Sequence, residues 1–417
     1  MNSQKPTALN LQPTFGFGDR LGGATPGHIA ALRHAGGDIR AIFAQQSIRE
    51  MARTNREPHQ VMQDAADALA AADYEQPWGS DADHLKTQLD VDRMMQAGFT
   101  FFTIDPSDHV DQQADNYSAE QVRERYRRRE WVNEYADQVV DLPDGNTLTL
   151  DPDGLERAAV KYAAAIDHAI KLGLHIQRAA EQMGRKCEIE LSVDETSQPT
   201  KLLEHYVIAD QLRRAGVGLV SLAPRFIGEL EKGIDFIGDV AAFEASVAQH
   251  AAIAQKLGPY KLSLHSGSDK LSIYPAFAQA TSGLFHVKTA GTSYLEALRV
   301  VARRDETLFR RIVSFSRDRY EIDRATYHVH ATLNDAPPEA DVADIKELES
   351  HYLELWDEVE PGKGFTKPGR QILHCTFGSV VTEADLGPGL SACLHRHPDT
   401  YLELLDEHFG RHLRALS

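Results

Sequence analysis

Residues 263–270, SLHSGSDK, place chemically reactive side chains directly after a short apolar run. The side chains are an imidazole, two hydroxyls, a carboxylate and an ammonium group, from His265, Ser266, Ser268, Asp269 and Lys270. A surface turn uses Gly, Ser and Asp, but it has no use for a histidine at a strand tip. This pattern predicts that His265 binds a metal ion and that the following loop, which Gly267 allows to turn tightly, contacts a substrate.

Other apolar runs of the chain also end in polar side chains that could do chemistry. They deliver Asp105, Asp108, His109, Asp194, Glu195, Arg225, Glu229, Lys232, His286, Lys288, Thr289, Thr292, Ser293, His328 and His330. One Asp after a strand is most often a helix cap, and a lone buried histidine is most often a core residue. Because the pattern recurs at five strand ends, we interpret it as one convergent site.

Imidazoles and carboxylates without cysteine form the ligand mix for a divalent Zn, Mn, Ni, Co or Fe ion. The expected ligands are His109, His265 and His328, with His286, His330 and Asp194 as alternatives. Asp194 and Glu195 are adjacent, so along an extended strand at most one of them faces the metal, and Glu195 is preferred.

A set of donors among these residues suits an anion with several hydroxyls. The donors are Arg225, Ser266, Ser268, Lys270, Lys288, Thr289, Thr292 and Ser293. Lys288 with Thr289, Thr292 and Ser293 is expected to hold the anionic end, since HVKTAGTS leads from a strand into a helix start. The composition predicts an acidic sugar bound over a metal ion.

The elements that must position these residues alternate between short apolar runs and longer amphipathic stretches. Strands are predicted at Thr14–Phe17, Ile39–Ala44, Phe99–Ile104, Cys187–Val193, Gly218–Leu222, Tyr260–Leu264, Leu284–Lys288, Ala325–Ala331 and Gln371–Phe377. Strands that alternate with helices predict a parallel sheet. We expect an α/β fold, a (β/α)8 TIM-type barrel with additional helices and loop insertions, over a doubly wound sheet, because no G-x-G-x-x-G follows the first strand.

Composition limits the partners and the compartment. The chain has 417 residues, with 62 Asp and Glu against 44 Lys and Arg, a net charge of −18 that disfavours nucleic acid. No apolar stretch is long enough to span a membrane, the polar start excludes a standard secretory signal, and three scattered cysteines fit a reducing compartment, so the cytoplasm is expected. We expect a single elaborated barrel domain over residues 1–417, loosely ordered at 1–13, and the sequence does not indicate the oligomeric state.

Several blocks of the chain resemble the bacterial tagaturonate epimerase family. The blocks are FGFGDRLGGATPGH, WGSDADHLKT, TIDPSDHV, SVDETSQPT, LAPRFIGELEKGIDFIGD, HSGSDKLSIYP and HVKTAGTSYLEALR, between about residues 14 and 380. The resemblance implies a cytoplasmic, metal-dependent hexuronate epimerase with a barrel-like fold, which interconverts D-tagaturonate and D-fructuronate.

These two uronates differ at C3 counted from the carboxylate, which is C4 in ketose numbering, and the ketone is at C5. The C3 hydrogen is not next to the ketone, so a retro-aldol cleavage of C3–C4 with a metal-stabilised enediolate is expected. The candidate catalytic carboxylates are Asp108 and Glu229 as an acid/base pair, with Glu195 and Asp269. The alternatives are a metal-dependent epimerase, isomerase or aldolase for a neutral ketose such as tagatose or fructose, and a non-catalytic sugar-acid binding protein.

Overall fold

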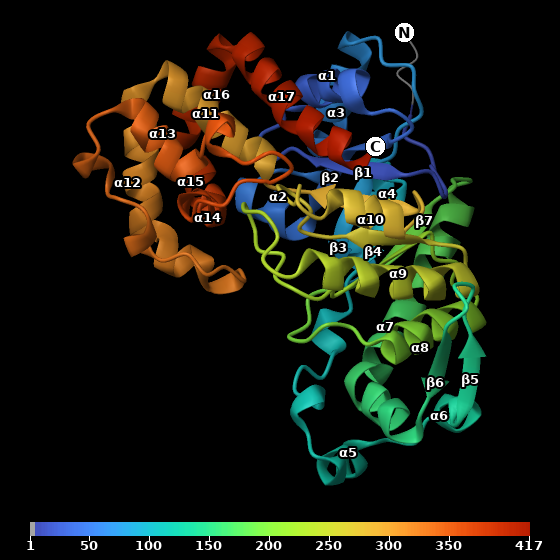
Figure 1. The fold of residues 1–417 in the computed structure, drawn as a ribbon. Helices are drawn as coiled ribbons and strands as arrows, with labels where there is room; N and C mark the ends of the chain where they lie inside the picture. Colours follow the sequence, from blue (N-terminus) through green and yellow to red (C-terminus); the bar gives the residue numbers. More distant parts are fainter. Residues whose placement is uncertain (1–4) are drawn as a thin grey trace.

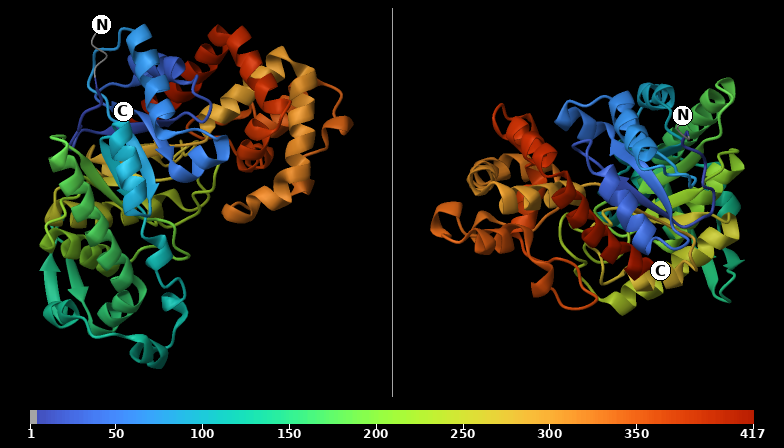
Figure 2. Two further views of the ribbon diagram at one scale, coloured as in Figure 1. Left: turned by 180° about the vertical axis from the view of Figure 1, so that it is seen from behind. Right: turned by 90° about the horizontal axis from the view of Figure 1, so that it is seen from above.

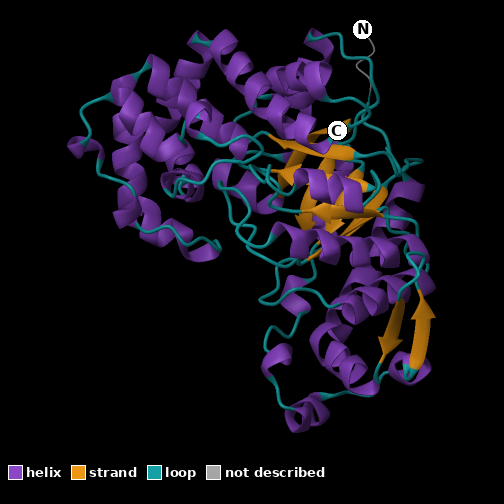
Figure 3. Ribbon diagram, in the orientation of Figure 1, coloured by secondary structure: helices purple, strands orange, loops and turns teal. Residues whose placement is uncertain are grey.

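Eight parallel strands close into a barrel in the computed structural model, which describes residues 5–417 (Figures 1 and 3). The strands are β1 Thr14–Gly18, β2 Arg40–Ser47, β3 Asp81–Leu85, β4 Phe101–Ile104, β7 Glu188–Val193, β8 Ser221–Pro224, β9 Lys261–Leu264 and β10 Phe285–Thr289. Their order around the barrel is β1-β10-β9-β8-β7-β4-β3-β2. With helices between the strands, this is a (β/α)8 TIM-type barrel, so the predicted fold class is confirmed.

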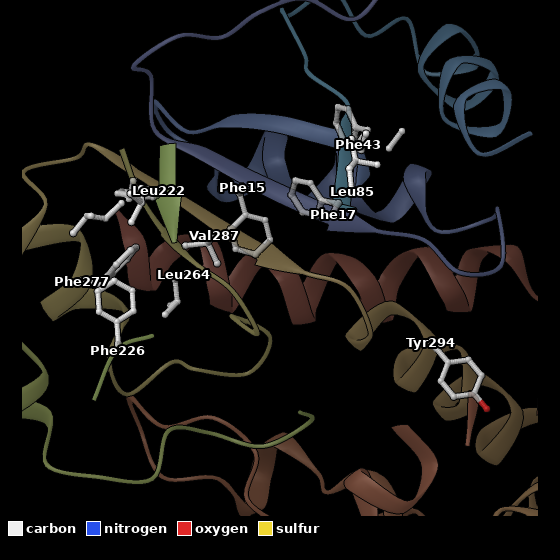
Figure 4. Packing of buried hydrophobic residues seen from close by; sticks show 14 of the residues in the cluster. Phe15, Phe17, Phe43, Leu85, Leu222, Phe226, Leu264, Phe277, Val287 and Tyr294 are labelled. Carbon is white, nitrogen blue, oxygen red and sulfur yellow. The ribbon is translucent and has the colours of Figure 1, made fainter. Parts of the chain in front are cut away.

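Polar and apolar side chains alternate along the barrel strands, although nearly all of them are buried. In β10, His286 and Lys288 alternate with Phe285 and Val287. The apolar side chains of the strands face outward, as Phe15 and Phe17 of β1 do (Figure 4). Their rings lie 6.0 and 5.1 Å from that of Phe409, which belongs to the carboxyl-terminal helix. The polar set points to the barrel axis, so the interior is a network of charged and hydroxyl groups.

Helices surround the barrel on its outer face (Figure 2). They are α1 Thr25–Ala35, α3 Pro58–Ala71, α4 Gln88–Ala97, α7 Pro152–Gln182, α8 Leu202–Arg214, α9 Val240–Leu257, α10 Tyr274–Ala280 and α17 Pro398–Leu416. The carboxyl-terminal helix α17 packs against α1, which brings the two ends of the described chain to the same side of the barrel. None of the helices within residues 5–417 is both long and apolar enough to cross a membrane.

Two further groups of elements extend from the barrel (Figure 1). Between β4 and β7 lie α5 Ala119–Arg125, α6 Glu130–Tyr135 and the antiparallel pair β5 Gln138–Asp141 and β6 Thr147–Leu150. After β10 the chain forms α11 Thr292–Arg304, α12 Glu306–Asp323, α13 Ile345–Leu353, α14 Gly369–Cys375, α15 Phe377–Thr382 and α16 Leu386–Arg396. This second group, here called the helical region, lies beside the barrel and packs on α2 Ile48–Thr54 through α15.

Some strand predictions differ from the structure. Strand β3 was not predicted, because its segment DADHL has no apolar run. The predicted strand Ala325–Ala331 is instead the end of a 3₁₀ turn followed by a loop, and the predicted strand Gln371–Phe377 lies mainly in α14. All residues of α14 are buried, and periodicity alone does not separate a short buried helix from a short buried strand.

The amino-terminal segment packs against the barrel. Leu9 is buried, and the backbone N–H of Thr7 donates a hydrogen bond to the carbonyl of Trp78 at 2.8 Å. The backbone N–H of Asn10 donates to the carboxylate of Glu188. These contacts contradict the expected loose order for residues 5–13, while residues 1–4 lie outside the described part of the chain.

Candidate active site

The carboxyl ends of the barrel strands open onto a cavity of about 350 Å³. Strand ends and the loops after them supply Gln45, Asp83, His84, Asp194, Glu195, Arg225, His265, Ser266, Ser268, Lys288, Ala290 and Gly291. The helical region adds Thr326, Tyr327, His328 and His374, so it covers the open end of the barrel. A larger groove of about 990 Å³ lies outside the barrel between α3 and α16, but it has no group of His, Cys, Asp or Glu placed to hold a metal ion among the residues described.

Lys288 is the centre of the charged network inside the barrel. Its Nζ lies 2.8 Å from Asp81, 2.7 Å from Asp83 and 2.8 Å from Glu190, and it donates to Thr103 Oγ1 at 2.6 Å. Burial alone would lower the pKa of Lys288, but the three carboxylates raise it well above its ordinary value. Its charge is therefore neutralised by the protein, which argues against the predicted role of Lys288 in holding the substrate anion.

His265 lies at the tip of β9, where the sequence predicted a ligand. Its Nε2 lies 2.7 Å from Glu190 Oε1, and its Nδ1 lies 3.1 Å from Asp194 Oδ1. Burial works against the charged imidazole, yet Asp194 and Glu190 raise the pKa of His265 to about 9. Glu190 holds Nε2, and Nδ1 lies against Asp194, a residue of the cavity wall.

His84, in β3, is the second imidazole of the cavity and was not among the predicted ligands. Its Nδ1 lies 3.3 Å from Asp105 Oδ2, while its Nε2 lies 3.8 Å from Asp83 Oδ1. The backbone of His84 has a φ of 52°, a left-handed conformation that residues other than glycine rarely adopt. Asp83 and Asp105 raise the pKa of His84 to about 10 against the effect of burial.

Asp83, His84 and His265 form a donor set that fits a divalent transition metal. One donor atom of each lies within 4.8 Å of the others. Each imidazole has one nitrogen held by a buried carboxylate, and this second interaction is the usual way in which proteins orient histidine ligands. The mixture of imidazole and carboxylate, with no cysteine, suits Zn, Mn, Ni, Co or Fe.

Asp194 and Glu195 both line the cavity. The expectation that at most one of them faces a metal ion stays a prediction, although β7 ends at Val193 and the alternation of an extended strand no longer applies to them. Asp194 contacts His265, whereas Glu195 Oε1 lies 3.1 Å from Arg49 Nη2. Among the cavity carboxylates of residues 5–417, Glu195 is the one that has neither a lysine nor a histidine within ion-pair distance.

Four further predicted residues lie at the cavity wall: Arg225, Ser266, Ser268 and His328. Arg225 and His328 both contact Glu229, at 3.1 and 2.8 Å, and the His328 side chain is 72% exposed. His328 is therefore far more open to solvent than the cluster of Asp83, His84 and His265. This position argues against His328 as a metal ligand.

Several predicted residues lie outside the cavity. Asp108 is exposed and pairs with Lys86 at 2.7 Å, and His109 stacks on His168 with ring centroids 4.2 Å apart. Both belong to a short 3₁₀ helix that follows β4 and turns them away from the barrel axis. Of the alternative ligands, His286 bonds to Thr14 inside the barrel and His330 pairs with Glu231.

The polar residues after Ser268 serve the packing of the loop. Asp269 is buried against Arg370, at 3.2 Å, and its backbone N–H donates to His412 Nε2 at 2.9 Å. Lys270 donates to three backbone carbonyls, and burial lowers its pKa to about 8. Gly267 is needed for close approach, since a Cβ there would lie 2.6 Å from a methyl group of Val287.

The hydroxyls predicted to bind the anionic end are also used internally. Thr289 donates to the carbonyl of Gly16 at 2.7 Å, and Ser293 donates to that of Gly18 at 2.8 Å. Thr292 Oγ1 lies 2.6 Å from His408 Nε2. Thr289 thus ties β10 to β1, while Thr292 and Ser293 fasten the start of α11 to α17 and to the barrel. None of the three lines the cavity.

A sequence profile of the family UxaE, described as tagaturonate epimerase, matches residues 1–416 of the chain. The chain belongs to the tagaturonate epimerase family. The tagaturonate/fructuronate epimerase of Thermotoga maritima is 40% identical over 415 residues, which cover 99% of this chain and 82% of that protein. Membership of the tagaturonate epimerase family confirms the predicted resemblance and the predicted enzyme class, a carbohydrate epimerase.

Solved structures of the same family share the fold. The native crystal structure of fructuronate-tagaturonate epimerase UxaE from Cohnella laeviribosi gives a TM-score of 0.91 at 38% identity, over 99% of this chain and 83% of that chain. A complex of the Cohnella enzyme with one glycerol gives a TM-score of 0.90 at the same identity and coverage. The Cohnella enzyme therefore shares the fold over nearly the whole of this chain, the barrel and the added helices included.

Proposed function

We propose that the chain interconverts D-tagaturonate and D-fructuronate in the cavity at the carboxyl ends of the strands, with a divalent metal ion. One observation carries the assignment of the site: His84 and His265 each have one ring nitrogen beside a buried carboxylate, and one donor atom of each lies within 4.8 Å of the other and of a carboxylate oxygen of Asp83. The substrate pair comes from the epimerases of Thermotoga and Cohnella to which the chain is similar.

Asp83, His84 and His265 would hold the metal ion. When bound there, a divalent ion supplies positive charge that stabilises the negative charge developing at the ketone during the reaction. Glu190 and Asp105 then act as positioning residues, because they fix the rings of the two histidines. Lys288 balances the carboxylates of the barrel interior and keeps Asp83 in place.

The epimerisation proceeds by retro-aldol cleavage and aldol re-formation. Glu195 removes the proton of the C3 hydroxyl, the C3–C4 bond breaks, and its electrons pass to C4 to give an enediolate and a C3 aldehyde. The aldehyde rotates about C2–C3, and C4 attacks its other face. The alkoxide that forms takes a proton from His328, which Glu229 contacts at 2.8 Å.

Product analysis tests this function. The metal-loaded protein is incubated with D-tagaturonate and the products are separated by chromatography, and D-fructuronate is the expected product. Glu195→Gln should reduce kcat by about 10²- to 10⁴-fold, the usual range for losing a proton-transfer group. Asp108→Asn is the matched control, since Asp108 lies outside the cavity, and it should retain full activity.

Other outcomes would select the alternatives. Turnover of tagatose or fructose without turnover of either uronate would indicate a neutral ketose as the substrate. Accumulation of three-carbon fragments would indicate an aldolase. Binding of the uronate without any product would contradict the proposal and leave a sugar-acid binding protein.

A further inference from the structure

We propose that the substrate carboxylate binds in the cavity between Lys232, His374 and the amino terminus of α11 at Gly291. This inference rests on the proposed function, because it concerns the acid group that separates a hexuronate from a neutral ketose. All three residues line the cavity, and they come from three separate parts of the chain: the loop after β8, helix α14, and the loop after β10.

Among the lysines and arginines of the cavity in residues 5–417, Lys232 is the one without a carboxylate at ion-pair distance. Four such side chains line the cavity: Arg49, Arg225, Lys232 and Lys288. The other three have ion-pair partners, at 3.1 Å for Arg49, 3.1 Å for Arg225 and 2.7–2.8 Å for Lys288. In residues 5–417 no carboxylate lies within 4.0 Å of Lys232 Nζ, which instead donates to Ser266 Oγ at 2.6 Å. An ammonium group has three donors, so two remain for a ligand.

The electrostatic surroundings of Lys232 and Lys288 also differ, in agreement with the difference in their ion-pair partners. Burial lowers the pKa of Lys232, and Asp194 and Glu195 offset that effect only in part. Lys288 Nζ lies 2.7–2.8 Å from three carboxylates. A further negative charge would therefore be stabilised next to Lys232 but not next to Lys288.

His374 is a buried imidazole without a hydrogen bond. Its residue is 2% exposed, and neither ring nitrogen has a partner among the residues described. Burial lowers its pKa well below the ordinary value, and the nearby cations Arg20, Lys232 and Arg370 act in the same direction. A neutral imidazole that faces cations can donate its single N–H to an anion, and an anion here satisfies a polar group that is otherwise costly to bury.

Gly291 brings the start of α11 directly against His374. A Cβ at Gly291 would lie only 2.1 Å from His374 Cε1, so a larger residue would displace the ring. Gly291 is the N-cap of this 13-residue helix, and no side chain caps it. Backbone N–H groups and the helix dipole at such an end favour a negative ligand.

The cavity thus offers two kinds of group. Asp83, His84 and His265 would hold the metal ion and the ketone end of the substrate, and Lys232 and His374 would hold the carboxylate. In the retro-aldol scheme the aldehyde fragment keeps the carboxylate, since it contains C1 to C3. A fixed carboxylate would retain this fragment while the aldehyde rotates, so the site also favours epimerisation over release of fragments.

The test compares an acid with a neutral sugar in Lys232→Met. Binding of D-galactonate, a hexonate with no ketone, is measured by calorimetry, and KM is measured for D-tagaturonate. Both the Kd and the KM should rise about 10- to 100-fold, as expected for a lost hydrogen bond to a charged group, while binding of D-tagatose should change little. Lys256→Met, on the exposed surface of α9, is the matched control and should change neither value.

His374→Gln provides an independent variant that retains a donor, whereas His374→Leu removes it. The Leu variant should weaken D-galactonate binding and the Gln variant should restore part of it, with folding checked by circular dichroism. Equal losses for D-galactonate and D-tagatose in Lys232→Met would overturn the inference, as would unchanged binding of both. If the unmodified protein binds D-galactonate through Lys232 but forms no D-fructuronate, the carboxylate site stands and the proposed function fails.

Discussion

Glu190 Oε1 lies 2.7 Å from His265 Nε2, and the two side chains are 0% and 4% exposed. The same oxygen lies 2.8 Å from Lys288 Nζ. One buried carboxylate oxygen thus accepts from a histidine and a lysine, because β7, β9 and β10 all send their polar side chains to the barrel axis. The other ring nitrogen of His265, Nδ1, lies 3.1 Å from Asp194, which lines the cavity.

Glu190→Gln should weaken metal binding and turnover together. An amide keeps the size of the side chain, but without the negative charge its oxygen binds His265 and Lys288 less strongly than the carboxylate does. The expected loss is about 10- to 100-fold in metal affinity or in kcat/KM, the usual effect of removing such a positioning residue. Metal content after gel filtration and steady-state kinetics measure the two effects.

Glu188→Gln is the matched control, since Glu188 is also buried in β7 but contacts the backbone of Asn10 away from the cavity. It should lower stability without changing kcat/KM. If both variants retain full activity and full metal content, Glu190 does not position His265.

The ligand set itself can be tested against the sequence-based prediction. His84→Asn and His265→Asn should each lose bound metal and activity, because an amide is a much weaker ligand than imidazole for these ions. His109→Asn should retain both, since His109 stacks on His168 outside the cavity. A chelator should abolish turnover of the unmodified protein and lower its melting temperature, and a divalent transition metal should restore both. Loss of metal in His109→Asn alone would favour the original prediction.

The sequence predicted His265 because an apolar run marks β9 so clearly. The sequence analysis did not identify Asp83 and His84. Their strand, DADHL, has only two apolar residues, which do not form a recognisable apolar run. The alternation of polar and apolar residues was nevertheless present in EIELSV and FHVKT, where it could have indicated Glu190 as a residue of the barrel interior.

Other parts of the site depend on tertiary structure. Asp108 and His109 follow a strand in the sequence, but a 3₁₀ turn directs them outward, and such a turn leaves no signal in residue type. His374 comes from a helix of the helical region that was predicted as a strand, and Lys232 lies several residues beyond β8. Their approach to one cavity follows from how α14 covers the barrel, which local sequence patterns do not specify.

The substitution Asp269→Asn tests whether Asp269 takes part in catalysis or only stabilises the fold. Asp269 is fully buried, and Arg370, His408 and His412 help to lower its pKa to about 2 although burial opposes this. Removing one partner of a buried ion pair leaves Arg370 uncompensated, which should reduce the free energy of unfolding by about 3–5 kcal/mol. Denaturant unfolding measures the loss, and the folded fraction should keep normal turnover.

Asp357→Asn, the same change at an exposed position, is the control for Asp269→Asn and should leave stability unchanged. The sequence-based interpretation predicts the opposite outcome at residue 269, a stable protein that binds metal but does not turn over. That result would return Asp269 to the catalytic residues.

A histidine pair remote from the cavity should make stability depend on pH. Nδ1 of His205 lies 2.8 Å from Nδ1 of His250, and His205 Nε2 lies 2.8 Å from the hydroxyl of Tyr260. Burial lowers the pKa of His250 to about 4 and that of His205 well below 6.5, so both are neutral in the folded protein at neutral pH. The unfolded chain binds more protons below pH 6.5, and stability must therefore fall as the pH falls from 6.5 towards 4. Between pH 7 and pH 5, His250 alone should contribute a loss of about 2 kcal/mol.

Denaturant unfolding of His250→Gln at pH 7 and pH 5 checks the effect of this pair. The variant should be less stable at pH 7, because it loses the contact with His205, but its further loss at pH 5 should be smaller than that of the unmodified protein by about 2 kcal/mol. His59→Gln, the same substitution on the exposed surface of α3, should leave the difference between the two pH values as it is in the unmodified protein. An undiminished loss at pH 5 in His250→Gln would show that other groups cause the acid sensitivity of the fold.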